Sequence, residues 1–404
     1  MTPSPPGVDV LFVCEYFAPA ELAGGGARSL VNTVARLGAR FRFAVVTRDH
    51  DVGDPRPFGN PPSRAWVRVG LADVYYAPDR ELTLRRLLAL VRAADPAVVY
   101  LNSLFSVLAI RILLLRRLGW MNGRSVVVAP EGELGAGALV TRSLRKHLYL
   151  RLARASGLLR GVLWKAASAP EAELVRQWFG EREPVTIAAS LSPSPSPAGS
   201  EPAEGARTAS VGGRSGELEL LFVSRIDPKK NLHFLLVALR QVRVPIHFGL
   251  AGPIADPVYW RRCERALALL PVNVRVTLYG ALPPKDVPEL LSRFDVLALP
   301  TLDENYGYVV LEALAAGCFV LLSPHTPWSD IEPAGVGQIL EVADPAPWCA
   351  AIEALAVRSQ AERERSRYLA VEYARRHLTS DEPLRLLEEL LAEAVSLTAA
   401  RTRR

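Results

Sequence analysis

Two cations follow a predicted buried strand in the second half of the chain. Arg225 and Lys230 come directly after the strand predicted at residues 218–223, in the sequence SRIDPKKN. Arginine binds phosphate oxygens through its guanidinium fork, and lysine acts as a point charge. Two fixed cations at a strand end therefore indicate a site that neutralises a diphosphate. A capped turn with solvated lysines would give the same spacing, so the sequence leaves both interpretations open.

Two carboxylates, Glu304 and Glu312, follow the strand predicted at residues 295–299 with seven residues between them. Gly307 and Tyr308 lie near the predicted start of a helix, where free N–H groups and the helix dipole favour anions. Glu312 lies inside that helix among apolar residues. A carboxylate there is costly unless it accepts hydrogen bonds, for instance from a pair of sugar hydroxyls. The alternative is structural, with Glu304 as a helix-terminal charge and Glu312 as a loop cap.

Glycines follow two other predicted strands. Gly24, Gly25 and Gly26 come after the first strand of the chain and precede a helix, so their amides could approach a phosphate or an acceptor. Gly252 follows the strand predicted at residues 246–250, where a glycine permits a close approach of backbone and ligand, or a tight turn.

These residues belong to two runs in which apolar strands and helices alternate. We predict strands at residues 8–13, 41–47, 97–101, 125–129, 218–223, 246–250, 274–278, 295–299 and 319–322. We predict helices at residues 27–37, 82–93, 106–118, 232–241, 257–270, 284–294 and 307–316, and a nearly all-helical chain from Pro345 onward. This alternation predicts parallel sheets covered by helices, whose ligands bind beyond the carboxyl ends of the strands. The fold class we predict is α/β, with two doubly wound, Rossmann-like domains facing across a cleft.

The composition places the domain boundaries. Residues 191–216 are rich in Pro, Ser and Gly and have almost no large apolar side chains, which is typical of a linker. We therefore predict an N-terminal domain at residues 1–190, a linker and hinge at 191–216, a C-terminal domain at 217–380 and a helical segment at 381–404.

Composition also excludes several classes of protein. The four cysteines lie far apart without a C-x-x-C pair, which excludes a cysteine-rich zinc module and favours a reducing compartment. The N-terminal residues show no secretory signal, and the most apolar stretch, residues 104–115, is too short to span a bilayer. We therefore expect a cytoplasmic protein.

The charge is unevenly distributed. Residues 1–190 hold 25 Lys and Arg against 16 Asp and Glu, whereas the remainder is slightly acidic. Residues 141–165 contain seven Arg and Lys and no acid, with leucines and aromatics in helical spacing. This segment could contact an anionic membrane at the inner face, which would suit a lipid-linked acceptor, or pack on the sheet as an ordinary amphipathic helix. No nucleic-acid-binding module accompanies the charge, so we expect no nucleic-acid partner.

Together these segments resemble the retaining, GT-B-fold glycosyltransferases of the group 1, or family-four, type. The specific matches are VSRIDPKKNL and the run from Glu304 to Gly317, in which the Glu-x7-Glu pattern is intact. Three more segments resemble the family: EYFAPAELAGGGARSL, APEGELGAGAL and the TPW that ends at Trp328.

The resemblance implies a function for each site residue. Arg225 and Lys230 would hold the diphosphate of a nucleotide-sugar, Glu304 the transferred sugar and Glu312 the ribose hydroxyls. The remaining implied donor contacts are Gly252, Asn305, Tyr306, Gly307 and Tyr308, with Gly24, Gly25 and Gly26 as a phosphate or acceptor loop. It also implies no metal and no cofactor besides the nucleotide-sugar co-substrate. The acceptor would be a hydroxyl of a glycan, a lipid-linked molecule or a small molecule, in cell-surface polysaccharide or glycoconjugate synthesis.

One position departs from the family pattern. Relatives commonly carry His or Arg where this chain has Glu131, and a carboxylate there would repel a diphosphate unless it is turned away or paired. Glu131 and Glu133 are therefore acceptor-side candidates. The departure keeps two alternatives open: a non-catalytic binding or scaffold subunit of the same fold, and a nucleotide-sugar epimerase.

Overall fold

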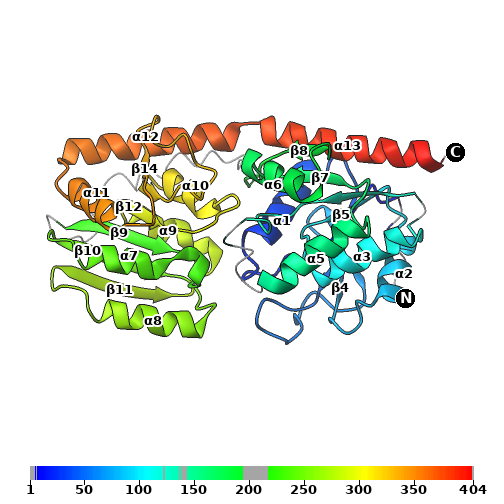
Figure 1. Ribbon diagram of the computed structural model, residues 1–404, viewed down its shortest axis with the longest axis horizontal. Helices are drawn as coiled ribbons and strands as arrows, with labels where there is room; N and C mark the ends of the chain where they lie inside the picture. Colours follow the sequence, from blue (N-terminus) through cyan, green and yellow to red (C-terminus); the bar gives the residue numbers. More distant parts are fainter. Residues whose placement is uncertain are drawn as a thin grey trace. The chain divides into compact units, whose positions relative to one another are not determined.

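The computed structural model describes residues 5, 7–121, 123–135, 137, 143–193 and 217–402. The chain divides into two compact units, which Figure 1 shows with a separate sheet in each. The first unit contains Met1–Ser194 and Asp381–Arg404, and the second contains Pro195–Ser380. Apart from residues 191–193, the linker predicted at residues 191–216 lies outside the described residues.

The first unit is built on one sheet. Its strands are β1 (Val10–Val13), β2 (Phe43–Arg48), β3 (Trp66–Val69), β4 (Ala72–Ala77), β5 (Val98–Leu101), β6 (Ser125–Val128), β7 (Leu163–Ala166) and β8 (Val185–Ile187). Among the described residues they follow the order β3-β4-β2-β1-β5-β6-β7-β8. Every neighbouring pair is parallel except β3 and β4, which are antiparallel.

The central strands of this sheet are apolar because both faces are covered. All four residues of β1, of β5 and of β6 are buried. The helices around them are α1 (Gly25–Leu37), α2 (Leu84–Ala94), α3 (Val107–Arg117), α5 (Ser143–Ala155), α6 (Ala169–Phe179) and α13 (Glu382–Thr402). The starts of α2, α3 and α6 are set by the side chains of Thr83, Ser106 and Ser168, which accept hydrogen bonds from first-turn amides.

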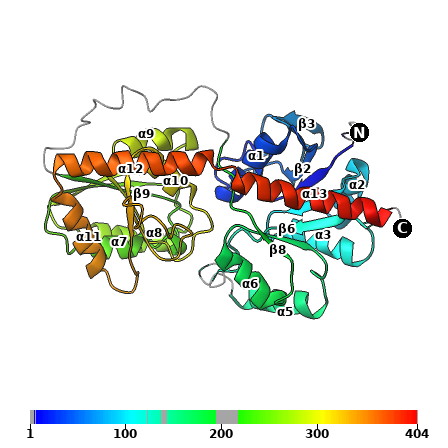
Figure 2. The ribbon, with the colours of Figure 1, turned by 90° about the horizontal axis from the view of Figure 1, so that it is seen from above.

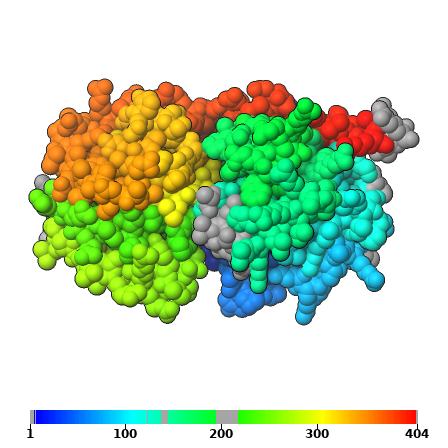
Figure 3. Space-filling model, in the orientation of Figure 1, coloured from blue at the N-terminus to red at the C-terminus, as the bar shows by residue number. Residues whose placement is uncertain are grey.

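The last helix of the chain packs on the first unit. Leu387, Leu390 and Leu391 of α13 are buried in the same cluster as β1 and β2 side chains. The hydroxyl of Thr398 accepts a 2.8 Å hydrogen bond from the amide of Ser125 at the start of β6. Figure 2 shows α13 in red beside β6 and β8, and in Figure 3 its residues form part of the surface of this unit. The segment predicted at residues 381–404 therefore completes the first core.

The second unit holds a purely parallel sheet in the order β11-β10-β9-β12-β13-β14, as far as the described residues extend. Its strands are β9 (Leu218–Val223), β10 (Ile246–Ala251), β11 (Val274–Gly280), β12 (Val296–Leu299), β13 (Phe319–Leu322) and β14 (Gly337–Ile339). Its helices are η2 (Pro228–Lys230), α7 (Leu232–Leu239), α8 (Pro257–Leu267), η3 (Pro284–Asp286), α9 (Val287–Ser292), α10 (Tyr308–Ala315), α11 (Ala346–Ala356) and α12 (Gln360–Thr379). Both units therefore have the predicted doubly wound architecture.

The structure corrects several sequence-based boundaries. The basic segment at residues 141–165 has leucines and aromatics in helical spacing, but its described part, from Ser143 on, forms helix α5 and then strand β7, which contains Lys165. The helix predicted at residues 284–294 is divided into η3 and α9. The hairpin of β3 and β4 was not predicted, because Arg68 and Asp73 interrupt the short apolar runs of its two strands. Within the described ranges, no helix combines the length and the hydropathy that crossing a bilayer requires.

Candidate functional site

The topology of the second unit brings the two predicted charged segments together. β9 and β12 lie side by side at the centre of the sheet. From β9 the chain continues to β10 on one side, and from β12 it continues to β13 on the other side. The point where strand order reverses is where sheets of this kind bind ligands, at the carboxyl ends of the strands. The segment after β9 carries Arg225 and Lys230, and the segment after β12 carries Glu304.

Backbone hydrogen bonds join these two segments into one structure. The amide of Leu302 donates to the carbonyl of Lys229 at 2.7 Å, and the hydroxyl of Thr301 donates to the same carbonyl at 3.2 Å. The ammonium of Lys229 also lies 3.0 Å from Oδ2 of Asp303. The amide of Glu304 is fixed from another side by the carbonyl of His325 at 2.8 Å.

Lys230 and Glu304 form an ion pair at the centre of the site. Their side chains are 10% and 14% exposed, so each charge is largely removed from water and balanced by the other. Asp227 organises the neighbouring cation: Oδ1 accepts a 3.0 Å hydrogen bond from the Lys230 amide, and Oδ2 lies 3.8 Å from the Arg225 guanidinium. The Arg225 side chain is half exposed, and it can therefore reach an anion in solution.

The start of α10 is held in place by an aromatic cluster. The indole N–H of Trp328 donates a 2.6 Å hydrogen bond to the carbonyl of Tyr306, and the rings of Tyr306 and Tyr308 lie 4.8 Å apart. Gly307 precedes the helix with φ of 78°, and a Cβ on it would lie 3.1 Å from Cγ of Glu304. Only glycine fits that position without pushing Glu304 or straining the backbone.

The other predicted donor contacts lie around this core. Asn305 is partly buried just before Gly307, and Glu312 is partly buried on α10 between the buried side chains of Leu311 and Ala313. Gly252 follows β10 with φ of 139°, and a Cβ there would lie 1.8 Å from the carbonyl oxygen of Ser224. The close approach that requires glycine at this position is therefore between two backbone segments of the chain itself.

The first unit has its own topological switch point, between β1 and β5. Gly24, Gly25 and Gly26 lie there, because α1 begins at Gly25, two residues before its predicted start. The side-chain amide of Asn102, the first residue after β5, donates to the carbonyl of Gly26 at 3.1 Å. Its Oδ1 is buried and lacks a hydrogen-bond partner among the described residues. Asn102 was missed in the sequence, although its place after an apolar strand was a usable signal.

Glu131 is paired with a buried lysine. Nζ of Lys165 on β7 lies 3.0 Å from Oε1 of Glu131, with 2% and 9% of the two side chains exposed. The repulsion of a diphosphate that the sequence predicted for an unpaired Glu131 is therefore offset by an adjacent cation. Lys165 could not be identified from the sequence, because it lies in a segment whose leucines and aromatics have helical spacing.

Glu133 points back into the protein. Its carboxylate accepts hydrogen bonds from the hydroxyl of Ser103 at 2.7 Å and from the amides of Leu104 at 2.6 Å and Phe105 at 3.2 Å. Burial raises the pKa of Glu133 to about 7 against these bonds. Burial also raises the pKa of Glu171, which accepts from the amides of Gly132 and Ala167. Both carboxylates thus fix the loop that carries Glu131.

The arrangement combines cations for an anionic group, carboxylates for hydroxyl groups and a glycine-led helix start within one edge of the second sheet. Within the described ranges, no group of three or more His, Cys, Asp or Glu side chains could hold a metal ion. All four cysteines are buried and free. The chemistry that this edge offers is the binding of a phosphorylated, hydroxyl-rich molecule.

Comparison with protein families and curated sequences gives matches to part of the chain. Residues 208–370 match the family described as Glycosyl transferases group 1. D-inositol 3-phosphate glycosyltransferase from Corynebacterium glutamicum is 30% identical over 109 residues, which are 25% of this chain and 25% of that protein. The match therefore spans about a quarter of the length of this curated relative.

Comparison with solved structures covers nearly the whole chain. Sucrose-phosphate synthase from Thermosynechococcus elongatus superposes with a TM-score of 0.72 at 18% identity, covering 97% of this chain and 100% of that one. HepE from Anabaena, solved in complex with UDP and glucose, gives a TM-score of 0.66 at 16% identity, covering 96% and 100%. These likenesses confirm the predicted GT-B fold class with its two Rossmann-like units.

Proposed function

We propose that this chain, whose residues 208–370 match the family of group 1 glycosyl transferases, is a retaining glycosyltransferase. It would move a sugar from a nucleotide-diphosphate-sugar to a hydroxyl of a glycan, a lipid-linked molecule or a small molecule. The observation that carries the proposal is the meeting of Arg225, Lys230 and Glu304 at the switch point of the second sheet, inside the matched segment.

The two cations suit a diphosphate that gains charge as it leaves the sugar. Arg225 is half exposed and can approach the diphosphate directly. Lys230 is buried against Glu304, so a bound diphosphate would share or replace its carboxylate partner. Cations fixed in advance stabilise the transition state without reorganising as the charge develops. In this proposal no metal ion or other cofactor is needed, because Arg225 and Lys230 neutralise the leaving group.

The carboxylates suit the hydroxyl groups of the donor. Glu304, held by the His325 carbonyl at its amide, would accept hydrogen bonds from the transferred sugar. Glu312, which is partly buried on α10, would accept hydrogen bonds from the ribose hydroxyls. The amides of Tyr306, Gly307 and Tyr308, with Asn305, would contact the phosphates and the sugar.

Retention of the anomeric configuration follows from the role proposed for the leaving diphosphate. The departing diphosphate would help to activate the acceptor hydroxyl on the face that it leaves, so the new bond forms with the configuration of the old one. In the first unit, the amides of Gly24, Gly25 and Gly26 would bind a phosphate or the acceptor. Oδ1 of Asn102, which has no hydrogen-bond partner among the described residues, would accept from a hydroxyl of the acceptor.

The comparisons support a nucleotide-sugar donor and the transfer of a sugar. HepE was solved with UDP and glucose, which supports a nucleotide-sugar as the donor. The curated relative is named as a D-inositol 3-phosphate glycosyltransferase, which supports glycosyl transfer.

The place of the reaction is also part of the proposal. Leu144, Leu148 and Leu152 lie on one face of α5 and are 88%, 58% and 59% exposed. Such a leucine face in a basic segment supports peripheral contact with an anionic membrane. We propose cell-surface glycan synthesis at the cytoplasmic face, consistent with four free cysteines.

The pairing of Glu131 with Lys165 weakens the strongest argument for a scaffold subunit, because Glu131 does not present an uncompensated negative charge.

The products of the reaction distinguish a transferase from the two alternatives, a nucleotide-sugar epimerase and a scaffold subunit. We would incubate the protein with UDP-, GDP-, ADP- and dTDP-sugars and a panel of alkyl glycosides, and follow the products by NMR. A transferase gives a new glycoside with the donor's anomeric configuration. An epimerase gives an altered sugar without a glycoside, and a scaffold gives no reaction.

A further inference from the structure

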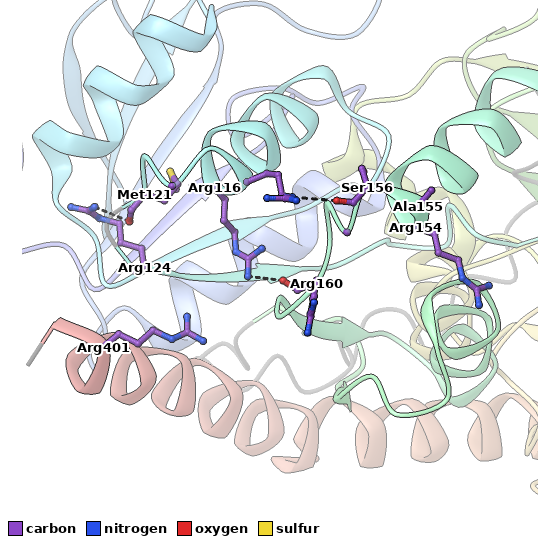
Figure 4. Close-up of a pocket in the computed structure, with 12 residues that line it drawn as sticks. Arg116, Met121, Arg124, Arg154, Ala155, Ser156, Arg160 and Arg401 are labelled. Atoms are coloured by element: carbon purple, nitrogen blue, oxygen red, sulfur yellow. Dashed lines mark hydrogen bonds between the residues drawn. The ribbon is translucent and has the colours of Figure 1, made fainter. Parts of the chain in front are cut away.

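A pocket of about 720 Å³ lies in the first unit, and none of the residues that line it belongs to the loops that carry Gly26 and Glu131. It is formed by the end of α3 with the loop to β6, the end of α5 with the loop to β7, and the end of α13. Figure 4 shows Arg116, Arg160 and Arg401 gathered around it, one from each of these three parts.

The lining of this pocket is strongly cationic. Six arginines and no acidic residue contribute to it: Arg116, Arg117, Arg124, Arg154, Arg160 and Arg401. Of these, only Arg124 has a carboxylate partner in the described part of the chain, the exposed Asp95. Other arginines of this unit, such as Arg64 and Arg68, are neutralised by Glu81 and Asp73. The pocket therefore concentrates positive charge that the protein leaves unbalanced.

Backbone carbonyls orient the guanidinium groups without neutralising them. Arg116 donates to the carbonyls of Arg160 at 2.9 Å and Gly161 at 2.8 Å, and Nε of Arg117 donates to the carbonyl of Ser156 at 3.2 Å. These bonds fix the direction of each fork and lower the conformational freedom that binding would otherwise remove.

The arginines of the pocket also repel one another. Burial, together with the positive charge of Arg401, lowers the pKa of Arg116. An anion in the pocket would relieve this repulsion and favour the charged form of the guanidinium.

The pocket and the acceptor-side loops lie at opposite ends of the same strands. The pocket loops enter β6 and β7 at their amino ends, whereas Glu131 follows β6 at its carboxyl end. Four residues of β6 separate the two ends, a distance of roughly 13 Å at the rise of a strand. A ligand in the pocket would therefore not be the same chemical group as a ligand bound beside Glu131. It would be a different molecule, or a different part of the same molecule.

We propose that this arginine pocket is a second ligand site, which binds a multiply charged phosphate group. Several convergent guanidinium forks match the oxygens of a phosphomonoester or a diphosphate, and the volume is that of a small-molecule site. The phosphate could belong to a lipid headgroup or to a free phosphorylated compound, and the two share this recognition chemistry.

The reference protein for the test is this chain carrying Arg225→Ala, so that the proposed donor site contributes little to phosphate binding. Inorganic pyrophosphate is titrated into this protein, into the same protein with Arg160→Gln and Arg401→Gln, and into a matched control with Arg85→Gln and Arg92→Gln. The control removes the same charge from exposed positions on α2 of the same unit. We expect the affinity to fall about tenfold or more in the pocket variant and to change less than about twofold in the control.

Equal affinity of the pocket variant and the control, or no binding by the reference protein, would overturn the proposal. If the double variant does not fold, the single change Arg401→Gln at the exposed end of α13 serves instead. A sedimentation assay with phosphatidylcholine vesicles, with and without phosphatidate, then identifies the source. Binding to phosphatidate vesicles that pyrophosphate reverses and the pocket variant lacks indicates a lipid headgroup. Pyrophosphate binding without vesicle binding indicates a free phosphorylated compound.

Discussion

Nζ of Lys165 lies 3.0 Å from Oε1 of Glu131, and both side chains are almost completely buried. The two residues come from the carboxyl end of β6 and from the neighbouring strand β7. The two opposite charges cancel at a position where a lone carboxylate would repel an anionic substrate. Breaking a buried pair leaves one charge uncompensated in a low dielectric, which is where the desolvation penalty is largest.

We expect Lys165→Met to lower the free energy of unfolding by about 3 to 5 kcal/mol. Adding Glu131→Gln to the same protein should recover most of that loss, because the uncompensated charge is then removed. Urea unfolding of the two variants measures this coupling. The matched control is Arg68→Met, which breaks an exposed pair with Asp73 and should cost less than about 1 kcal/mol. A Lys165→Met protein no less stable than the control would contradict the interpretation.

The raised pKa of Glu133 predicts a pH-dependent stability. Between its ordinary value of 4.5 and about 7, the folded protein binds more protons at this carboxyl than the unfolded chain. The free energy of unfolding therefore falls as pH rises through this window. Across this pH window, the free energy of unfolding of wild type should fall by on the order of 3 kcal/mol more than that of Glu133→Gln, at about 1.36 kcal/mol per pKa unit. Denaturant unfolding across this pH range measures the difference. Glu173→Gln, at an exposed carboxylate of α6, should leave the wild-type slope unchanged, and parallel curves for Glu133→Gln and wild type would refute the assignment.

Trp328 is predicted to support the donor site through the carbonyl of Tyr306. Trp328→Phe removes one hydrogen bond at 2.6 Å and should weaken nucleotide binding roughly three- to tenfold. Trp348→Phe is the matched control, because its indole donates to the carbonyl of Glu341 at 2.9 Å elsewhere in the same unit. Calorimetry measures affinity, and thermal unfolding measures stability. Equal affinity losses in the two variants would show that Trp328 acts on overall stability and not on the site.

Much of the second unit could be predicted from its sequence because its strands are buried on both faces. The apolar runs at residues 218–223 and 319–322 match β9 and β13 residue for residue. β7 escaped prediction because it carries Lys165, whose partner is 34 residues away in the chain. A charged residue in a short strand is interpretable only when the neighbouring strand is known.

The candidate site was predictable in its residues but not in its contacts. Strand ends identified Arg225, Lys230 and Glu304 as neighbours at one edge of a sheet. The Lys230–Glu304 ion pair joins residues 74 positions apart and depends on β9 lying next to β12. The arginine pocket was visible only as an excess of basic residues, because its lining comes from three separate parts of the first unit.

The central claim is that the switch point of the second unit binds a nucleoside diphosphate through Arg225 and Lys230. The most direct measurement is calorimetric titration of UDP, GDP, ADP and dTDP into wild type, Arg225→Ala, Lys230→Ala and Glu312→Ala, with the exposed Lys285→Ala as control. We predict that one nucleotide binds wild type and the control equally, and that its affinity falls about tenfold or more in each site variant. Failure of all four nucleotides to bind wild type, or unchanged affinity in the site variants, would contradict the account.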